Sequence, residues 1–151
     1  MDARTFLNEV QNYIIIEWDY ECENVGLYWG YNNKLVICYY PTKGKPSLAF
    51  EAIKHEGIHA AQDCKAGKDN HKLQTLYPKD QMLDAVRKYS PRAEQATDNY
   101  DHPKYSHRWY LELEAWYMEY VSNYETLQTI ASVCPRIYNN NKLSYNDIKF
   151  H

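Results

Sequence analysis

The sequence lacks several features that mark whole classes of protein. Its longest purely apolar run, residues 35–40, is far shorter than the ~20 residues that a membrane-spanning helix needs. The first residues contain no basic segment followed by an apolar one, which a secretion signal requires. No basic run is long enough to predict a nucleic-acid surface, and 17 basic against 20 acidic residues give a formal charge of −3. We therefore expect a cytoplasmic protein that binds neither membrane nor nucleic acid; the sequence leaves its oligomeric state open.

Cysteine is scarce, and its spacing matches no known cysteine motif. The four cysteines are Cys22, Cys38, Cys64 and Cys134. No Cys-x-x-Cys pair occurs, which excludes zinc-ribbon and redox motifs. A tight turn centred on Asn32 and Asn33 would pair Leu27 with Cys38 and leave Cys22 beyond the paired strands. We expect reduced, mostly buried thiols.

The first third of the chain predicts a helix and a hairpin. Apolar residues recur at helical spacing over residues 3–13. Aromatic and β-branched runs on both sides of Asn32 and Asn33 predict a hairpin over residues 25–41. With 151 residues, the chain has the size of one domain. We expect a single, mainly helical α+β domain over residues 1–151, with a small antiparallel sheet.

The remaining residues predict two long helices separated by a polar stretch. The first begins at Pro46 and Ser47, with Ser47 as N-cap, and stops at Gly67. The second covers residues 107–131. Between them, the polar excursion 68–105 contains one further helical pattern, KDQMLDAVRKY, and the tail 138–151 is expected to be loose.

The stretch KHEGIHAAQ places a metal-binding pattern inside the first long helix. His55 and His59 are about 40° apart around the helix axis and ~6 Å apart along it, so both can direct a ring nitrogen at one metal ion. Glu56 is turned about 100° from His55, which suits a general base beside a metal-activated water. The pattern therefore predicts His55 and His59 as metal ligands and Glu56 as the catalytic residue.

A catalytic zinc site needs a third protein ligand. A three-histidine motif would require glycine at position 62 and histidine at position 65, but the chain has Gln62 and Lys65 there. The downstream stretch RWYLELEAWYMEY supplies the carboxylates Glu112, Glu114 and Glu119 instead. Glu112 and Glu114 are about 200° apart on a helix, so only one of them can face the metal.

The combination of HEGIH and a later ELEAW resembles the gluzincin zinc metallopeptidases, in particular the compact minigluzincins. The resemblance implies a zincin-like fold with an active-site helix and one Zn²⁺ per chain. It also implies Glu112, in a Glu-x-x-Ala stretch, as the third ligand; Glu114 remains the alternative. Trp116 occupies the position where these families often place a partner for a ligand histidine, so that partner is unassigned.

The predicted function is hydrolysis of peptide bonds in a peptide or protein substrate by a zinc-dependent metallopeptidase, with Glu56 as general base. An edge strand beside the metal would bind the substrate in an extended form. Candidates for the oxyanion donor are Tyr105, His107, Tyr110, His71 and His102, and none is assigned. The alternatives are a non-catalytic interaction module that retains the scaffold, with or without zinc, and hydrolysis of a non-peptide amide.

Overall fold

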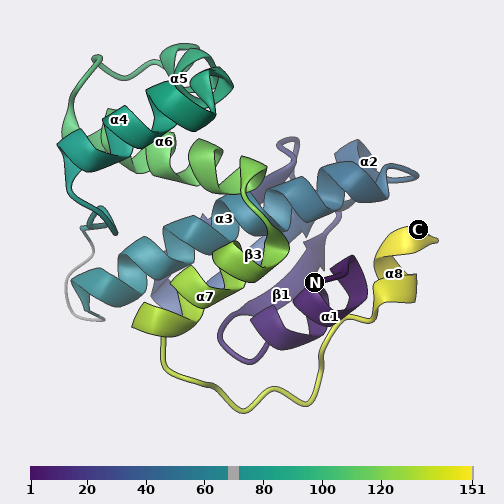
Figure 1. The fold of residues 1–151 in the computed structure, drawn as a ribbon. Coiled ribbons are helices and arrows are strands. Elements are labelled where there is room, and N and C mark those ends of the chain that lie inside the picture. Colours follow the sequence, from purple (N-terminus) through teal and green to yellow (C-terminus); the bar gives the residue numbers. More distant parts are fainter. Residues whose placement is uncertain (68–71, 151) are drawn as a thin grey trace.

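The protein is described by a computed structural model that covers residues 1–67 and 72–150. It is an α+β structure (Figure 1). The helices are α1 (Ala3–Val10), α2 (Tyr39–Thr42), α3 (Pro46–Ala66), α4 (Lys79–Tyr89), α5 (Pro91–Asp98), α6 (His107–Tyr120), α7 (Asn123–Val133) and α8 (Tyr145–Lys149), and the short 3-10 helix is η1 (Gly30–Asn32). The strands are β1 (Ile15–Asp19), β2 (Gly26–Trp29) and β3 (Lys34–Cys38). In Figure 1, α3 runs across the middle of the molecule, with α6 above it, α7 below it and the sheet behind it.

The sheet is mixed, which corrects the prediction of an antiparallel sheet. Its strand order is β1-β3-β2, with β1 parallel to β3 and β2 antiparallel to it. Residues 15–19 were not recognised as a strand, because parallel pairing with β3 is a long-range contact that local patterns do not show. The hairpin register also differs, since Leu27 pairs with Val36 and η1 lies in the turn. Residues 35–38 of the central strand β3 are buried, while β2 is an edge strand.

Two disulfides overturn the prediction of reduced cysteines. Cys22 is joined to Cys38, and Cys64 is joined to Cys134. The first pair forms because β1 runs parallel to β3 with Asp19 opposite Cys38, so the chain after β1 begins beside the end of β3. The second pair joins the C-terminal ends of α3 and α7, at a sequence separation of 70 residues.

Helix α3 occupies the centre of the fold. It starts at Pro46 with Lys45 as N-cap and no side-chain cap, so the prediction of Ser47 as N-cap is wrong. Gly67 follows its last residue with φ of +90°, a conformation that favours glycine. At Gly57, an added Cβ would lie 3.1 Å from Ile130 Cδ1 on α7. This glycine therefore serves helix packing on the side of α3 that faces the core.

The helix predicted over residues 107–131 is two helices. The chain is extended at Val121, and the Ser122 side chain caps α7 by accepting from the Glu125 N–H at 3.1 Å. The spacing Ser-x-x-Glu is a sequence signature of a helix start. Ser122 and Glu125 have this spacing, so the sequence itself indicates the start of a new helix here.

The polar excursion contains more structure than expected. Besides α4, it forms α5, which begins with Pro91 in its first turn. These helices pack on α6 around a small core of Met82, Val86, Ala93, Trp109 and Leu113. Tyr117 contacts both this cluster and the main core, so α6 connects the two.

The tail is also ordered, contrary to the expectation of a loose end. Ser144 and Asp147 form a capping box at α8, and Ile148 is buried in the main core. The side chain of Gln11 bonds both the N–H and the C=O of Leu143, at 2.7 and 2.9 Å. Among the helices of the described residues, none is both long and apolar enough to cross a bilayer.

The Cys64–Cys134 disulfide closes a long loop and should contribute strongly to stability. We expect the double variant Cys64→Ala/Cys134→Ala to lose about 2–5 kcal/mol of unfolding free energy in urea titrations. Dithiothreitol should destabilise the wild type more than this variant, which provides the control. Free thiols at Cys64 and Cys134 in mass spectrometry of unreduced protein would contradict the pairing.

Glu94 on α5 joins α4 to the start of α6. Its carboxylate accepts from Arg87 Nε at 2.9 Å and pairs with Lys104 Nζ at 3.1 Å. Bonding to Arg87, and then to Lys104, lowers the pKa of Glu94 to about 2. This stabilisation is present above the ordinary glutamate pKa of about 4.3 and is lost as the pH falls towards 2.

We therefore expect Glu94→Gln to lower the unfolding free energy at neutral pH by about 1 kcal/mol or less, because both cationic partners are largely exposed. The difference from wild type should shrink between pH 4.5 and 2, as measured by denaturant titration. A difference that stays constant over this range would argue against the ion pairs.

Candidate metal site

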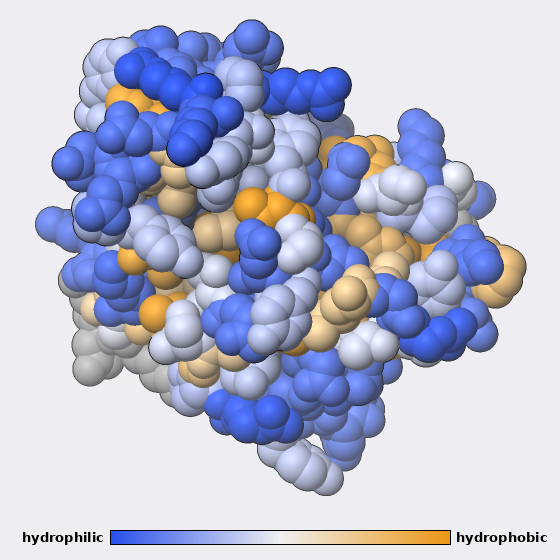
Figure 2. Space-filling model, in the orientation of Figure 1, coloured by the Kyte–Doolittle hydropathy of each residue, from blue (hydrophilic) through white to orange (hydrophobic). Residues whose placement is uncertain are grey.

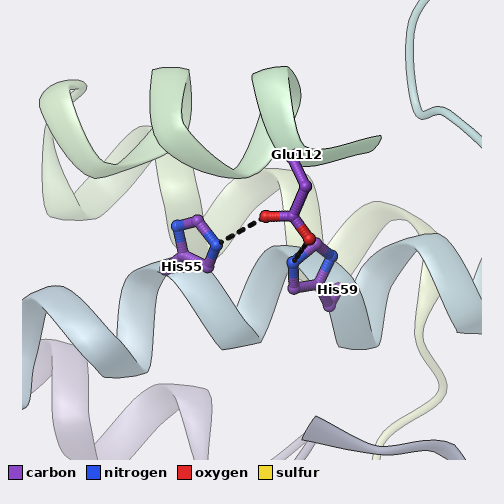
Figure 3. Close-up of side chains that lie close together, drawn as sticks. All are labelled: His55, His59 and Glu112. Atoms are coloured by element: carbon purple, nitrogen blue, oxygen red, sulfur yellow. Dashed lines mark hydrogen bonds and ion pairs between the residues drawn. The ribbon is translucent and has the colours of Figure 1, made fainter. Parts of the chain in front are cut away.

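Helices α3 and α6 bring together the three residues of the candidate metal site. His55 and His59 lie one turn apart on α3, and both are 8% exposed. Glu112 points from α6 between them (Figure 3). Its Oε2 lies 3.2 Å from His55 Nε2, and its Oε1 lies 3.2 Å from His59 Nε2. These residues can each offer a ligand atom within 4.8 Å of the others, so the group could hold a metal ion.

Glu114 is directed away from the histidines. Its carboxylate accepts from the backbone N–H groups of Leu76 and Tyr77, at 2.8 and 2.9 Å, and from Gln62 Nε2 at 3.0 Å. These bonds hold the segment before α4 against α6. The structure therefore places Glu112 at the candidate site and gives Glu114 a structural role.

Each histidine is oriented by a second partner that sequence reasoning did not assign. His55 Nδ1 lies 2.9 Å from Glu119 Oε2, and His59 Nδ1 lies 2.8 Å from Gln62 Oε1. Glu119 is two turns after Glu112 on α6, so its helical position was the available signal. It supplies the support that the sequence did not show at Trp116, whose ring packs edge-on against the His55 ring at 4.9 Å.

The hydrogen-bond network assigns the tautomers. Gln62 donates both amide hydrogens, to Leu111 O and to Glu114, so its oxygen accepts from His59 Nδ1. Glu119 likewise accepts from His55 Nδ1. In their neutral forms, both histidines therefore turn an Nε2 lone pair towards the Glu112 carboxylate. Two imidazoles with one carboxylate form a ligand set that suits zinc.

The pKa shifts of His55 and Glu112 show that the site favours positive charge on the histidine and negative charge on the carboxylate. Burial opposes charge on His55, but bonding to Glu112 and Glu119 raises its pKa to about 9. Burial likewise opposes charge on Glu112, but bonding to both histidines holds its pKa well below the usual range. The same carboxylate that raises the pKa of His55 would attract a metal ion.

Glu56 borders the site without joining the ligand group. It lines the same cleft as His55, and burial raises its pKa. Strand β2 approaches closely here: a Cβ added at Gly26 would lie 3.1 Å from Ala52 Cβ and 3.5 Å from Glu56 Cγ. No hydrogen bond or ion pair joins the Glu56 carboxylate to any residue within 1–67 or 72–150, which leaves it free for a ligand.

A cleft of about 650 Å³ opens over the site. Residues of the edge strand β2, of α3 and of α6 line it, Trp116 of α6 among them, together with Tyr100. The Tyr100 ring lies 6.2 Å from that of Trp116, in a tilted arrangement. Tyr100 and Arg108 are cleft residues that sequence reasoning missed, because only the fold brings them to the motif.

The sequence candidates for an oxyanion donor lie elsewhere. Tyr105 and Tyr110 pack around Trp109, outside the cleft lining. His107 Nε2 bonds Leu73 O at 2.8 Å. His102 stacks on Tyr100 at 6.2 Å without lining the cleft, and His71 lies outside the described residues.

The two glutamates of α6 give a direct test of the ligand set. We expect zinc-free wild type to bind one zinc ion in isothermal titration calorimetry. Glu112→Gln should weaken binding by roughly 100-fold or more, because the neutral amide cannot offset the ion's charge. Glu114→Gln should bind zinc nearly as tightly as wild type, since its partners are backbone N–H groups and Gln62. The reverse order would move the third ligand to Glu114.

Comparisons with known proteins do not identify a relative of this chain. No protein-family model, curated protein or solved structure matches the chain. The functional interpretation therefore depends on the site's own chemistry.

Proposed function

We propose that the protein is a zinc-dependent peptidase. The observation that carries the proposal is the convergence of His55, His59 and Glu112 beside an unpaired Glu56, within a cleft bordered by an edge strand. A structural zinc site needs neither a free carboxylate nor an open cleft. A hydrolytic site needs both.

The ligand residues would hold one Zn²⁺ through both Nε2 atoms and the Glu112 carboxylate. A zinc ion held in this way polarises a carbonyl group and lowers the pKa of a bound water to about 7. Glu119 and Gln62 keep the two imidazoles in the ligating tautomer. Since the raised pKa of His55 favours its protonated form, zinc binding would displace a proton from this ring.

Glu56 is the proton carrier in this proposal. Its carboxylate accepts a proton from the attacking water as the new C–O bond forms, and then donates it to the amine nitrogen as the C–N bond breaks. Its raised pKa brings it closer to the operating pH, which favours both transfers. Tyr100 is the hydroxyl donor among the cleft residues beyond β2, and we assign it to stabilise the developing oxyanion.

The substrate would lie along β2. That strand pairs with β3 on one edge only, so its other edge can bond an extended peptide. Gly26 allows this strand to approach α3 closely, which brings a peptide on the open edge near Glu56. An amide of another kind could reach the same groups but would not use the strand.

The rival proposal, a non-catalytic interaction module, requires a broad aromatic or apolar surface. On the face shown in Figure 2, the apolar areas are separated by hydrophilic side chains. The open cleft beside the histidines favours the enzyme over this rival.

The disulfides favour an oxidising compartment over the cytoplasm that the sequence predicted.

The decisive experiment replaces Glu56. We expect Glu56→Gln to bind zinc with nearly unchanged affinity and to cleave peptides on the order of 10²–10⁴ times more slowly than wild type. The assay is a quenched-fluorescence peptide library with zinc-loaded protein, and Glu125→Gln, which changes an exposed α7 carboxylate outside the cleft lining, is the control. Equal cleavage by wild type and Glu56→Gln, or none by wild type, would contradict the proposal.

A further inference from the structure

Arg108 is a cationic residue of the cleft lining. It lies one turn before Glu112 on α6, lines the cleft and is exposed. Other cations in this region are occupied: Arg87 bonds Glu94, and Lys104 pairs with Glu94 and Asp98. Arg108 forms no ion pair or hydrogen bond with the described residues. A guanidinium in this setting is available for an anionic group of a ligand.

Arg108 lies at one definite end of the cleft. Helices α3 and α6 are antiparallel, since Lys54 Nζ bonds Glu119 O while Gln62 Nε2 bonds Leu111 O. Arg108, just before Leu111, is therefore at the Gln62 end of α3.

Strand β2 runs towards the same end. Gly26 approaches Ala52, and further along, the Tyr28 hydroxyl donates to Asp63 at 2.6 Å. The strand thus runs from the Ala52 end of the cleft towards the Arg108 end, and the candidate metal site lies between these two ends.

Five glutamates also line the cleft. Glu23 and Glu51 line the end opposite Arg108, both exposed and without an ion pair to the described residues. Glu56, Glu112 and Glu119 line the middle. Arg108 is the one lysine or arginine among the described residues of the lining. A carboxylate of a ligand is therefore attracted by Arg108 at one end of the cleft and repelled by Glu23 and Glu51 at the other.

We propose that the cleft selects extended peptides that carry a carboxylate at the Arg108 end. This deepens the proposed peptidase function and rests on it for turnover, but not for binding. The carboxylate has two sources, which correspond to two peptide directions. A peptide antiparallel to β2 presents an acidic side chain from its N-terminal half, and a parallel peptide presents its C-terminal carboxylate or an acidic side chain near it.

The test measures binding separately from cleavage. Zinc-loaded Glu56→Gln is titrated into short fluorescein-labelled peptides of neutral residues, followed by fluorescence anisotropy. One pair of peptides carries Glu or Gln near the N-terminus, and another carries Glu or Gln near an amidated C-terminus. A third pair contains no Glu and compares a free C-terminus with an amidated one. Comparison of the pairs identifies the source of the carboxylate.

We expect the carboxylate member of at least one pair to bind about five- to tenfold more tightly than its amide counterpart, with a smaller ratio at high salt. Adding Arg108→Gln should remove this preference, and Arg108→Glu should reverse it in favour of the amide member of the pair. Arg92→Gln, which changes an exposed arginine outside the cleft lining, should retain it. Zinc stoichiometry and melting temperature check that each variant is folded.

Equal binding of the carboxylate and amide peptides, no binding by any peptide, or a preference that survives Arg108→Gln would overturn the proposal. Charge-selective binding together with no cleavage by wild type would leave this proposal standing and remove the peptidase function. Cleavage without any charge preference would do the reverse.

Discussion

The structure depends on one electrostatic constraint, the concentration of electron-pair donors between α3 and α6. Two imidazole Nε2 atoms and the Glu112 carboxylate converge where the helices are in contact, and all three residues are buried. Burying such a group without a cation is costly. Positive charge at this point, from protons or a metal ion, would offset that cost, so binding of a cation there would stabilise the folded state.

The residues around this point maintain it from both helices. Lys54 extends from α3 to the C-terminal end of α6, where it bonds the carbonyl groups of Glu119 and Val121. These contacts satisfy helix-end carbonyls and fix the turn that carries Glu119, the partner of His55. Gln62 similarly connects His59 to the backbone of α6. Helix register and ligand orientation are thus set by the same bonds.

The parts of this arrangement that the sequence predicted are those encoded over a few residues. The spacing of His55 and His59 within a helix, and the stop at Gly67, follow from local geometry, and the structure contains both. The Cys22–Cys38 disulfide and the role of Glu119 were missed because each depends on segments that meet only in the fold. A parallel strand pair and a contact between helices leave no periodic signal in either partner.

The brevity of β2 has a consequence beyond the site. A strand with a free edge is a template for pairing with other chains, and natural proteins limit this hazard by shortening or charging such edges. The strand contains four residues, Gly26–Trp29, and ends at η1. Asn33, with φ of 49°, then turns the chain into β3. Two molecules that met along this edge could share only a short ladder, which protects the open edge against self-association and aggregation.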